Sequence, residues 1–295
     1  NPAAALLPAT YGVDDIPVII QDRDFTEDGQ LDFAIDPGDN GNLYDTLTVN
    51  GTINPFIEVP KGFVRLRLLN GSQARIYRLG VEGADMVKIA SDGGYLVSPV
   101  LIEQLTLAPG DRAEIVVDVG ESPVAMVDDH FGRVLEIRPN GVVSSAGQLP
   151  GKLADIERIP ESEITVERRF HMEDARNFWE FDPSWAINGA QMDMGRIDET
   201  MRFGDTERWI LSAGDGQHVF HPHQTQFQIL TINGEPPPPD ESGWEDSVLV
   251  NAQREVVVAV RFDTYAAEDI PYMFHCHILD HEDLGMMGQF LVIGE

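Results

Sequence analysis

The sequence predicts an all-β protein composed of two Greek-key β-sandwich domains. Short apolar runs rich in β-branched residues, such as 115–119 and 256–260, recur along the chain, and apolar residues alternate with arginines across 64–68. Helical periodicity is scarce, and Gly, Pro, Asn and Asp bound the runs, as is typical of antiparallel sandwiches. At 295 residues the chain is long enough for two domains that each bury a core.

A weak internal duplication indicates that the two sandwiches repeat one plan. LLNGSQ, which contains Asn70, precedes DRAEIVVDV, and ILSAGD, which contains Ser212, precedes QREVVVAVRF. The spacing from Asn70 to Arg112 equals the spacing from Ser212 to Arg254, at 42 residues.

The duplication and a stretch rich in Gly, Ser and Pro set the expected boundaries. We expect a first domain at 1–145, a linker at 146–160 and a second domain at 161–295. With a constant offset of 142 residues between the copies, Cys276 corresponds to Val134. The first domain is therefore expected to lack the metal ligands described below.

Composition excludes several classes of protein. With 20 basic and 50 acidic residues, the net charge of −30 would repel a phosphate backbone, so nucleic acid is not an expected partner. The acidity favours a strongly solvated surface, a cationic substrate or a salty environment. No apolar run approaches the roughly 20 residues of a membrane span, and we expect none. Because the chain begins with Asn1 and shows no leader pattern, we expect that a leader or a longer N-terminal region has been removed.

Six of the eight histidines lie in two short clusters around the one cysteine. The segments are HVFHPH and HCHILDHEDLGMM, and such clustering is improbable by chance. A lone cysteine also rules out an internal disulfide. The sequence therefore predicts metal binding by His218, His221, His223, His275, Cys276, His277, His281 and Met286.

Strand alternation divides these ligands into two sites. Successive side chains of a strand point to opposite faces, so His275 and His277 face one way and Cys276 the other. In the first segment His221 and His223 share a face, and His218 points to the opposite side. We therefore expect Cys276 with His218 at one site and the four remaining strand histidines at another.

The cysteine site is completed by His281 and Met286, which follow at intervals of five residues and suit a loop around one ion. Two imidazoles, a thiolate and a weak thioether are the ligands of a blue-copper electron-transfer centre. A structural zinc site usually has more cysteines and little use for methionine, so copper is favoured. Four imidazoles without a thiolate suit copper that meets dioxygen, and Cys276 joins the two sites covalently.

The sequence resembles the three-domain multicopper oxidases, in particular the bacterial copper-efflux oxidase and laccase group. HCHILDHEDLGMM matches the terminal copper signature of that family at every ligand, and GVDDIPVIIQDRDF, RLRLLNGSQAR, IASDGG, APGDRAEIVVDV and GWEDSVLV extend the resemblance over nearly the whole chain. The resemblance implies two cupredoxin-like domains, equivalent to the second and third domains of the family, of which the first is copper-free. The chain departs from the HPxHxHG motif at Val219 and Gln224.

The resemblance also assigns copper ligands residue by residue. It implies type 1 ligation by His218, Cys276, His281 and Met286, type 2 ligation by His221, and type 3 ligation by His223, His275 and His277. Glu282, beside a ligand in HED, is a candidate proton donor for oxygen reduction, and Asp215 is a candidate for admitting or positioning a substrate.

The family draws four further histidines of its trinuclear cluster from an N-terminal domain, whereas residues 1–217 contain only His130 and His171. We therefore expect an upstream oxidase domain to complete the cluster. The resemblance implies one-electron oxidation of a phenol, an aromatic amine or a low-valent metal ion, reduction of dioxygen to water, and an extracytoplasmic location, periplasmic or secreted.

Other functions fit parts of the pattern. An electron-transfer or copper-storage protein would use the type 1 site alone, and a copper-free relative would serve as a structural scaffold, although the complete ligand set argues against the latter. A two-domain laccase would carry ligands in its first domain.

Overall fold

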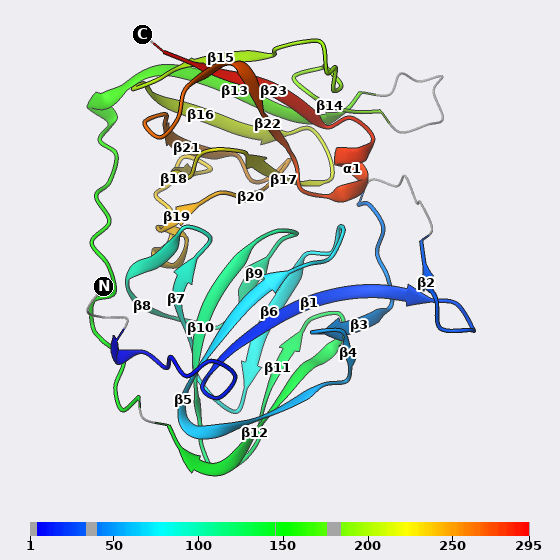
Figure 1. Ribbon diagram of the computed structural model, residues 1–295, viewed down its shortest axis with the longest axis vertical. Coiled ribbons are helices and arrows are strands. Elements are labelled where there is room, and N and C mark those ends of the chain that lie inside the picture. The colour runs from blue at the N-terminus through cyan, green and yellow to red at the C-terminus, as the bar shows by residue number, and fades with distance from the viewer. Residues whose placement is uncertain (1–4, 34–39, 145, 176–183, 295) are drawn as a thin grey trace. The chain divides into compact units, whose positions relative to one another are not determined.

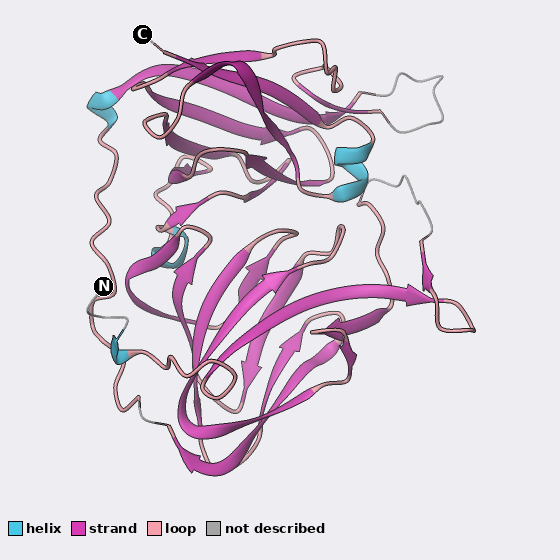
Figure 2. Cartoon of the chain, viewed as in Figure 1, coloured by secondary structure: helices cyan, strands magenta, loops and turns pink. Residues whose placement is uncertain are grey.

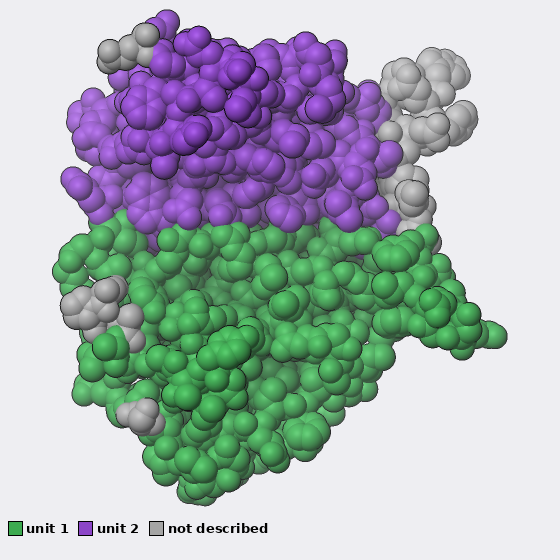
Figure 3. Space-filling view, in the orientation of Figure 1, with its two compact units in different colours: residues 1–34, 43–156 green, residues 35–42, 157–295 purple. Residues whose placement is uncertain are grey.

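The computed structural model describes residues 5–33, 40–144, 146–175 and 184–294, and almost all of its regular structure is β-strand (Figures 1 and 2). The prediction of an all-β fold is confirmed. Two compact units are present: unit 1 is Asn1–Ala34 with Leu43–Ile156, and unit 2 is Ile35–Asn42 with Glu157–Glu295 (Figure 3). Residue 145, the expected end of the first domain, lies outside the described residues. Within the described part of the chain, no helix has the length and apolar character needed to span a membrane.

Unit 1 is a sandwich built from the first half of the strands. In chain order they are β1 (Asp15–Phe25), β2 (Leu31–Asp32), β3 (Thr46–Val49), β4 (Thr52–Ile53), β5 (Phe56–Asn70), β6 (Tyr77–Glu82), β7 (Met86–Ser91), β8 (Gly94–Ile102), β9 (Leu105–Leu107), β10 (Arg112–Val119), β11 (Val124–Asp128) and β12 (Gly132–Val143).

The long strand β5 takes part in both sheets of this sandwich. Its first half pairs in parallel with β12, and its second half pairs in parallel with β1 and antiparallel with β10. The strand passes from one sheet to the other near Gly62, whose φ of 98° is accessible to glycine and strained for other residues. Apolar side chains of the two sheets, among them Val64, Leu66 and Ile115, fill the space between them.

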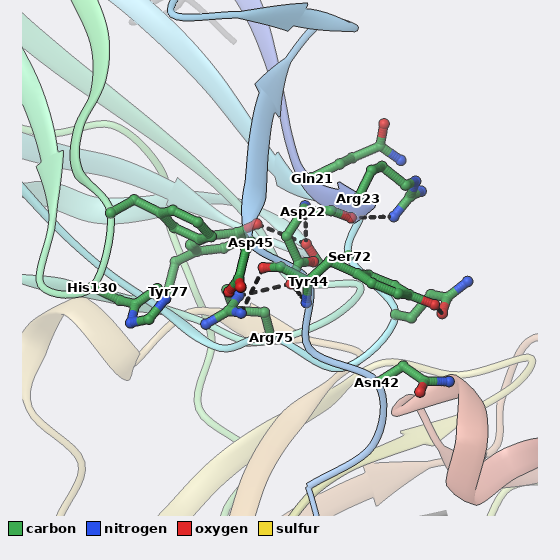
Figure 4. A network of polar contacts seen from close by, with 12 residues as sticks. Gln21, Asp22, Arg23, Asn42, Tyr44, Asp45, Ser72, Arg75, Tyr77 and His130 are labelled. Atoms are coloured by element: carbon green, nitrogen blue, oxygen red, sulfur yellow. Dashed lines mark hydrogen bonds and ion pairs between the residues drawn. The ribbon is translucent and has the colours of Figure 1, made fainter. Parts of the chain in front are cut away.

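A buried polar network lies within unit 1 (Figure 4). Asp22 is fully buried and accepts hydrogen bonds from Arg75 Nε at 2.7 Å and from the Tyr44 main-chain N–H at 2.9 Å. The main-chain N–H of Asp22 donates to Ser72 Oγ at 3.0 Å, and Ser72 Oγ lies 2.7 Å from the Tyr77 hydroxyl. Burial raises the pKa of Tyr77. The network joins three separate segments of the unit through paired charges and hydrogen bonds.

Unit 2 contains the remaining elements. They are η2 (Glu161–Glu163), β13 (Ile164–Asp174), β14 (Trp185–Ile187), β15 (Glu199–Arg202), β16 (Thr206–Ala213), β17 (Gln217–Pro222), β18 (Phe227–Ile232), η3 (Pro239–Glu241), β19 (Trp244–Glu245), β20 (Val248–Asn251), β21 (Val256–Arg261), β22 (Ala267–Cys276), α1 (Leu279–Asp283) and β23 (Met287–Ile293); η2 and η3 are 3₁₀ turns.

The two units share one strand plan. The order β3-β1-β5-β10-β7-β8 in unit 1 has the same senses of pairing as β14-β13-β16-β21-β18-β19 in unit 2, with one parallel pair in each. The second sheets match as well, with β12-β11-β6-β9 corresponding to β23-β22-β17-β20. The internal duplication read from the sequence is therefore present in the fold.

One residue correspondence predicted from that duplication, between Cys276 and Val134, was wrong. Val134 lies in β12, the counterpart of β23, whereas the counterpart of β22, which carries Cys276, is β11. A constant offset fails here because unit 2 has extra residues before Cys276: β10 ends at Val119 and β11 at Asp128, whereas the corresponding β21 ends at Arg261 and β22 at Cys276. Cys276 therefore does not correspond to Val134.

The core of unit 2 is aromatic. Phe170 of one sheet contacts Phe274 and Phe220 of the other, with ring centroids 4.9 and 5.2 Å apart, and Trp209 contacts Phe220 with ring centroids 6.1 Å apart. Buried aromatic pairs contribute roughly 0.5–1.5 kcal/mol beyond their area. Phe220 belongs to β17 and Phe274 to β22, so this core packs against the two strands that also carry candidate ligands.

Candidate metal centre

Strands β17 and β22 bring the two histidine clusters together. They pair antiparallel, with Phe220 opposite Cys276 and His221 opposite His275. Side chains of paired residues lie on the same face of a sheet, so Cys276 shares the core face with Phe220, and His221 and His275 lie on the other face. The structure thus separates two groups of potential ligands, as strand alternation predicted.

The first group consists of His218, Cys276 and His281, all of which are fully buried. Cys276 Sγ lies 3.8 Å from His218 Nδ1 and 3.7 Å from His281 Nδ1, and the two nitrogens are 3.1 Å apart. One sulfur and two nitrogens therefore converge on one point in the interior of unit 2.

A short loop closes this group. After Cys276 the chain forms α1 and turns at Gly285, whose φ is 109° (Figure 1). The Met286 N–H then donates to the His281 carbonyl at 2.9 Å, and the Cys276 N–H donates to the Met286 carbonyl at 3.0 Å. Met286 is fully buried. The main chain of Met286 is thereby fixed to two members of the group.

Hydrogen bonding and burial prepare this group to bind a metal. His218 Nε2 lies 3.0 Å from the Asp215 carbonyl, which can only accept, so Nε2 carries the proton and Nδ1 offers a lone pair. Burial lowers the pKa of His218 to about 4 and that of His281 to about 3, so both rings are neutral at pH 7. Burial raises the pKa of Cys276 to about 12, so metal binding must displace the thiol proton.

The donors fit a copper ion. The three donor atoms lie 3.1 to 3.8 Å from one another, close enough for one ion with bonds of about 2.0 Å to nitrogen and about 2.3 Å to sulfur to contact all three. The Val219 N–H points at Cys276 Sγ at 3.5 Å, as suits a thiolate. A donor set of two imidazoles and one thiolate beside a buried methionine is that of a blue-copper centre.

The second group lies on the opposite face and contains His221, His223 and His275. His223 Nε2 and His275 Nε2 are 3.1 Å apart. His277 adjoins them, with its ring centroid 5.5 Å from that of His221 and 5.6 Å from that of His275. The four imidazoles predicted for one face are therefore together.

Main-chain carbonyls set the tautomers of two of these rings. His221 Nδ1 donates to the Asp246 carbonyl at 2.6 Å, and His275 Nδ1 donates to the Cys276 carbonyl at 2.9 Å. Their Nε2 atoms are left as lone-pair donors. Burial lowers the pKa of His221 to about 4 and lowers the pKa values of His223 and His277, so these rings are also neutral at pH 7.

The two predicted catalytic acids occupy different positions. Glu282 is half-buried, with Oε2 3.3 Å from His275 Nδ1. Burial raises the pKa of Glu282, but the hydrogen bond with His275 and the surrounding histidines outweigh burial, so the net pKa is lowered. Asp215 is exposed, and it contacts the first group through its main-chain carbonyl. Their proposed roles in catalysis stay predictions.

A hollow of about 950 Å³ opens beside the second group. His221 and His223 line it together with Trp244, Arg261 and Tyr272. The second group is therefore accessible from solvent on this side, in contrast to the buried first group.

Sequence reasoning missed Trp185. This fully buried residue of β14 stacks on His281, with ring centroids 4.0 Å apart and planes at 31°, and lies 5.6 Å from the His218 ring. Its indole covers one side of the first group. Trp185 precedes the ligand clusters by more than 30 residues in an ordinary apolar strand, and the sequence carried no signal for this contact.

The two other histidines take no part in either group. His130 packs its ring against Phe131 in unit 1, and His171 Nδ1 lies 2.9 Å from Ser212 Oγ in unit 2. Within the described residues, the groups arranged to hold a metal are the two of unit 2.

The fold and the two groups together define a cupredoxin-like metal-binding protein. The sequence profile for multicopper oxidases matches residues 159–295. Among solved structures, the laccase-like multicopper oxidase CueO from Ochrobactrum sp. superposes with a TM-score of 0.90 at 32% identity, over 99% of this chain and 70% of that one. A multicopper oxidase from Pediococcus acidilactici gives a TM-score of 0.87 at 32% identity, over 99% and 61%.

Curated relatives of the chain are named as cell division proteins, whereas the similar solved structures are multicopper oxidases. "Cell division protein FtsP" from Photorhabdus laumondii is 36% identical and that from Escherichia coli is 38% identical, each over 97% of this chain. The chain spans 63% of the length of these relatives. The chain belongs to the multicopper oxidase family, and membership of that family implies copper binding.

Proposed function

We propose that this chain is the electron-accepting part of a multicopper oxidase, corresponding to the second and third domains of a three-domain enzyme. One observation carries the proposal: the tripeptide His275-Cys276-His277 contributes its cysteine to one metal-binding group and its two histidines to another. A protein that only stores or carries one copper has no use for the second group.

We base the ligand roles on the family pattern, and the two groups of unit 2 support them. When copper is bound, the first group and Met286 would hold the type 1 ion, His221 the type 2 ion, and His223, His275 and His277 the type 3 ions. Unit 1 is assigned no copper. Copper, when bound, supplies the one-electron chemistry that takes electrons from a donor and reduces dioxygen to water.

The residues of the chain organise this chemistry. Cys276 is bonded through the main chain to both His275 and His277, which provides a short covalent path between the groups. Glu282 extends from the half-exposed end of α1 to His275, and we assign to Glu282 Oε2 the transfer of protons from solvent. Asp215, exposed beside His218, is assigned to positioning a substrate.

The second group needs a partner to be complete. Four imidazoles lie there, and the family pattern calls for eight. We propose that an N-terminal oxidase domain supplies the other four, that the electron donor is a phenol, an aromatic amine or a low-valent metal ion, and that the protein works outside the cytoplasm, in the periplasm or after secretion.

Two alternatives remain distinct from an oxidase. A type 1 copper electron-transfer or storage protein would need only the first group. A role in cell division is suggested by the name of the curated relatives. A purely structural role does not require the convergent, neutral and buried ligands of the first group, which support the oxidase.

Oxygen consumption and stopped-flow reduction test the proposal. The 295-residue chain loaded with copper should hold a reducible blue copper and consume oxygen slowly, because the second group has half of its ligands. Joining an upstream domain with two H-x-H pairs should give sustained turnover with water as product. A joined protein that is blue and consumes no oxygen would contradict the oxidase and support the electron carrier. Rapid uptake by the 295-residue chain would contradict the assigned source of the cluster ligands.

A further inference from the structure

Helix α1 is held by a residue that lies 238 positions away in the sequence. The main-chain N–H of Asn42 donates to Asp280 Oδ2 at 2.6 Å, and Asn42 Nδ2 donates to Asp280 Oδ1 at 2.7 Å. Asn42 is 5% exposed and Asp280 is 9% exposed. Both carboxylate oxygens of Asp280 are therefore engaged by Asn42 in a buried setting, where hydrogen bonds to a carboxylate are stronger than those between neutral groups.

The helix depends on contacts of this kind. It contains five residues, Leu279–Asp283, and its N-cap, Ile278, makes no side-chain capping bond. A single helical turn is unstable on its own, because few hydrogen bonds offset the ordering of its backbone. The position of α1 must therefore be set by its bonds to the rest of unit 2.

What α1 carries gives this position a functional meaning. Asp280 is followed by His281, which belongs to the first metal-binding group, and then by Glu282, whose carboxylate lies against His275 of the second group. A shift of α1 would move a candidate ligand of one group and a contact of the other at the same time.

We propose that Asn42 is a positioning residue for the copper site: by holding Asp280 it fixes α1, and with it the placement of His281 for copper and of Glu282 against His275. The proposal rests on the proposed copper function. Residues that hold metal ligands in place typically change metal affinity 10–100-fold when they are substituted.

Exchanging the two side chains tests this role. In Asn42→Asp two carboxylates face each other, and in Asp280→Asn two amides do. The double variant Asn42→Asp/Asp280→Asn again pairs an amide with a carboxylate and leaves an amide oxygen to accept the main-chain N–H. We expect each single variant to bind copper about 10–100-fold more weakly and the double variant to recover most of this loss. Copper affinity is measured by competition with a chelator, followed through the thiolate-to-copper absorption of the 295-residue chain.

A second readout needs no copper. Amide hydrogen exchange across residues 279–285 of the metal-free chain should become faster in each single variant and slow again in the double variant. Asn140→Asp is the control: it makes the same charge change at an exposed site in β12 and should alter neither readout.

The outcomes separate this proposal from the proposed function. Unchanged exchange and affinity in Asn42→Asp, or a double variant no better than the single ones, would overturn the role of Asn42. If the wild-type chain formed no thiolate-bound copper, the copper function would fail, and the positioning of His281 for copper would fail with it. The exchange data would then show separately whether Asn42 holds α1.

Discussion

The two units follow the same strand plan and differ in the connection that carries metal ligands in unit 2. Between β11 and β12, unit 1 has three residues, 129–131, whereas between β22 and β23, unit 2 has ten, 277–286. The longer connection contains His277, α1, His281 and Met286. Metal binding in this protein therefore depends on a lengthened loop at one end of a common scaffold, and the scaffold alone does not specify it.

The paired strands beside that connection also carry potential metal ligands in unit 2 and different side chains in unit 1. In unit 2, His221 of β17 lies opposite His275 of β22, whereas in the equivalent strands of unit 1, Leu79 lies opposite Asp128. Unit 1 buries polar groups too, but it pairs them with one another, as Asp22 and Arg75 show. Unit 2 instead buries neutral imidazoles and a thiol whose lone pairs converge.

Because unit 1 buries a charged pair, we expect the largest loss of stability when one member of that pair is removed. Arg75→Met should lower the free energy of unfolding by about 3–5 kcal/mol, because it leaves the charge of Asp22 buried without its partner. The double variant Asp22→Asn/Arg75→Met should recover much of that loss, since no charge is left unpaired. Chemical denaturation of the three proteins measures the effect. Equal stability of Arg75→Met and the wild type would show that the ion pair does not stabilise unit 1.

A smaller loss of stability, with a specific effect on copper, is expected at Trp185. Trp185→Leu should cost roughly 2 kcal/mol, less than the 3–5 kcal/mol of a full truncation to alanine, and should weaken copper binding because the indole no longer covers His281. Trp209→Leu is the matched control: it removes another buried tryptophan of unit 2 whose indole bonds to Glu207. Thermal melts and copper titrations compare the two. An equal effect on copper affinity would show that the cover over His281 has no special role.

The smallest structural effect is expected at Met286. Met286→Leu conserves side-chain volume, so the cost in stability should stay below about 1.5 kcal/mol. The copper should be retained and its reduction potential should rise, because a weak axial ligand tunes the potential more than it binds. Redox titration of the blue absorption measures the change. A lowered potential or loss of copper would contradict an axial role.

The sequence predicted the β-rich fold and the separation of the ligands because both follow from the alternation of side chains along a strand, which has a period of two residues. Once β17 and β22 are strands, His218, His221, His275 and Cys276 can point only to the faces that the structure shows. The constant offset between the copies was wrong from β11 onwards, because a repeat frame contains no information on the lengths of the segments that follow β10 and β21.

The contacts that complete the site could not be predicted in this way. Trp185 contacts His281 of α1 from β14, which lies in a different sheet from β22. Asn42 contacts Asp280 across 238 positions of the sequence. Neither residue belongs to a motif, and their positions depend on tertiary packing. The tautomers of His218 and His221 likewise depend on the main-chain carbonyls of Asp215 and Asp246.

Thiolate ligation in unit 2 is the central claim, and spectroscopy of the copper-loaded chain tests it most directly. Absorption and electron paramagnetic resonance should show an intense blue thiolate-to-copper transition with a narrow copper hyperfine splitting. Cys276→Ser should remove both signals completely, whereas Met201→Leu, a volume-conserving change at another buried methionine of unit 2, should leave both unchanged. A Cys276→Ser protein that stays blue, or a wild-type chain that binds copper without the blue transition, would contradict the account.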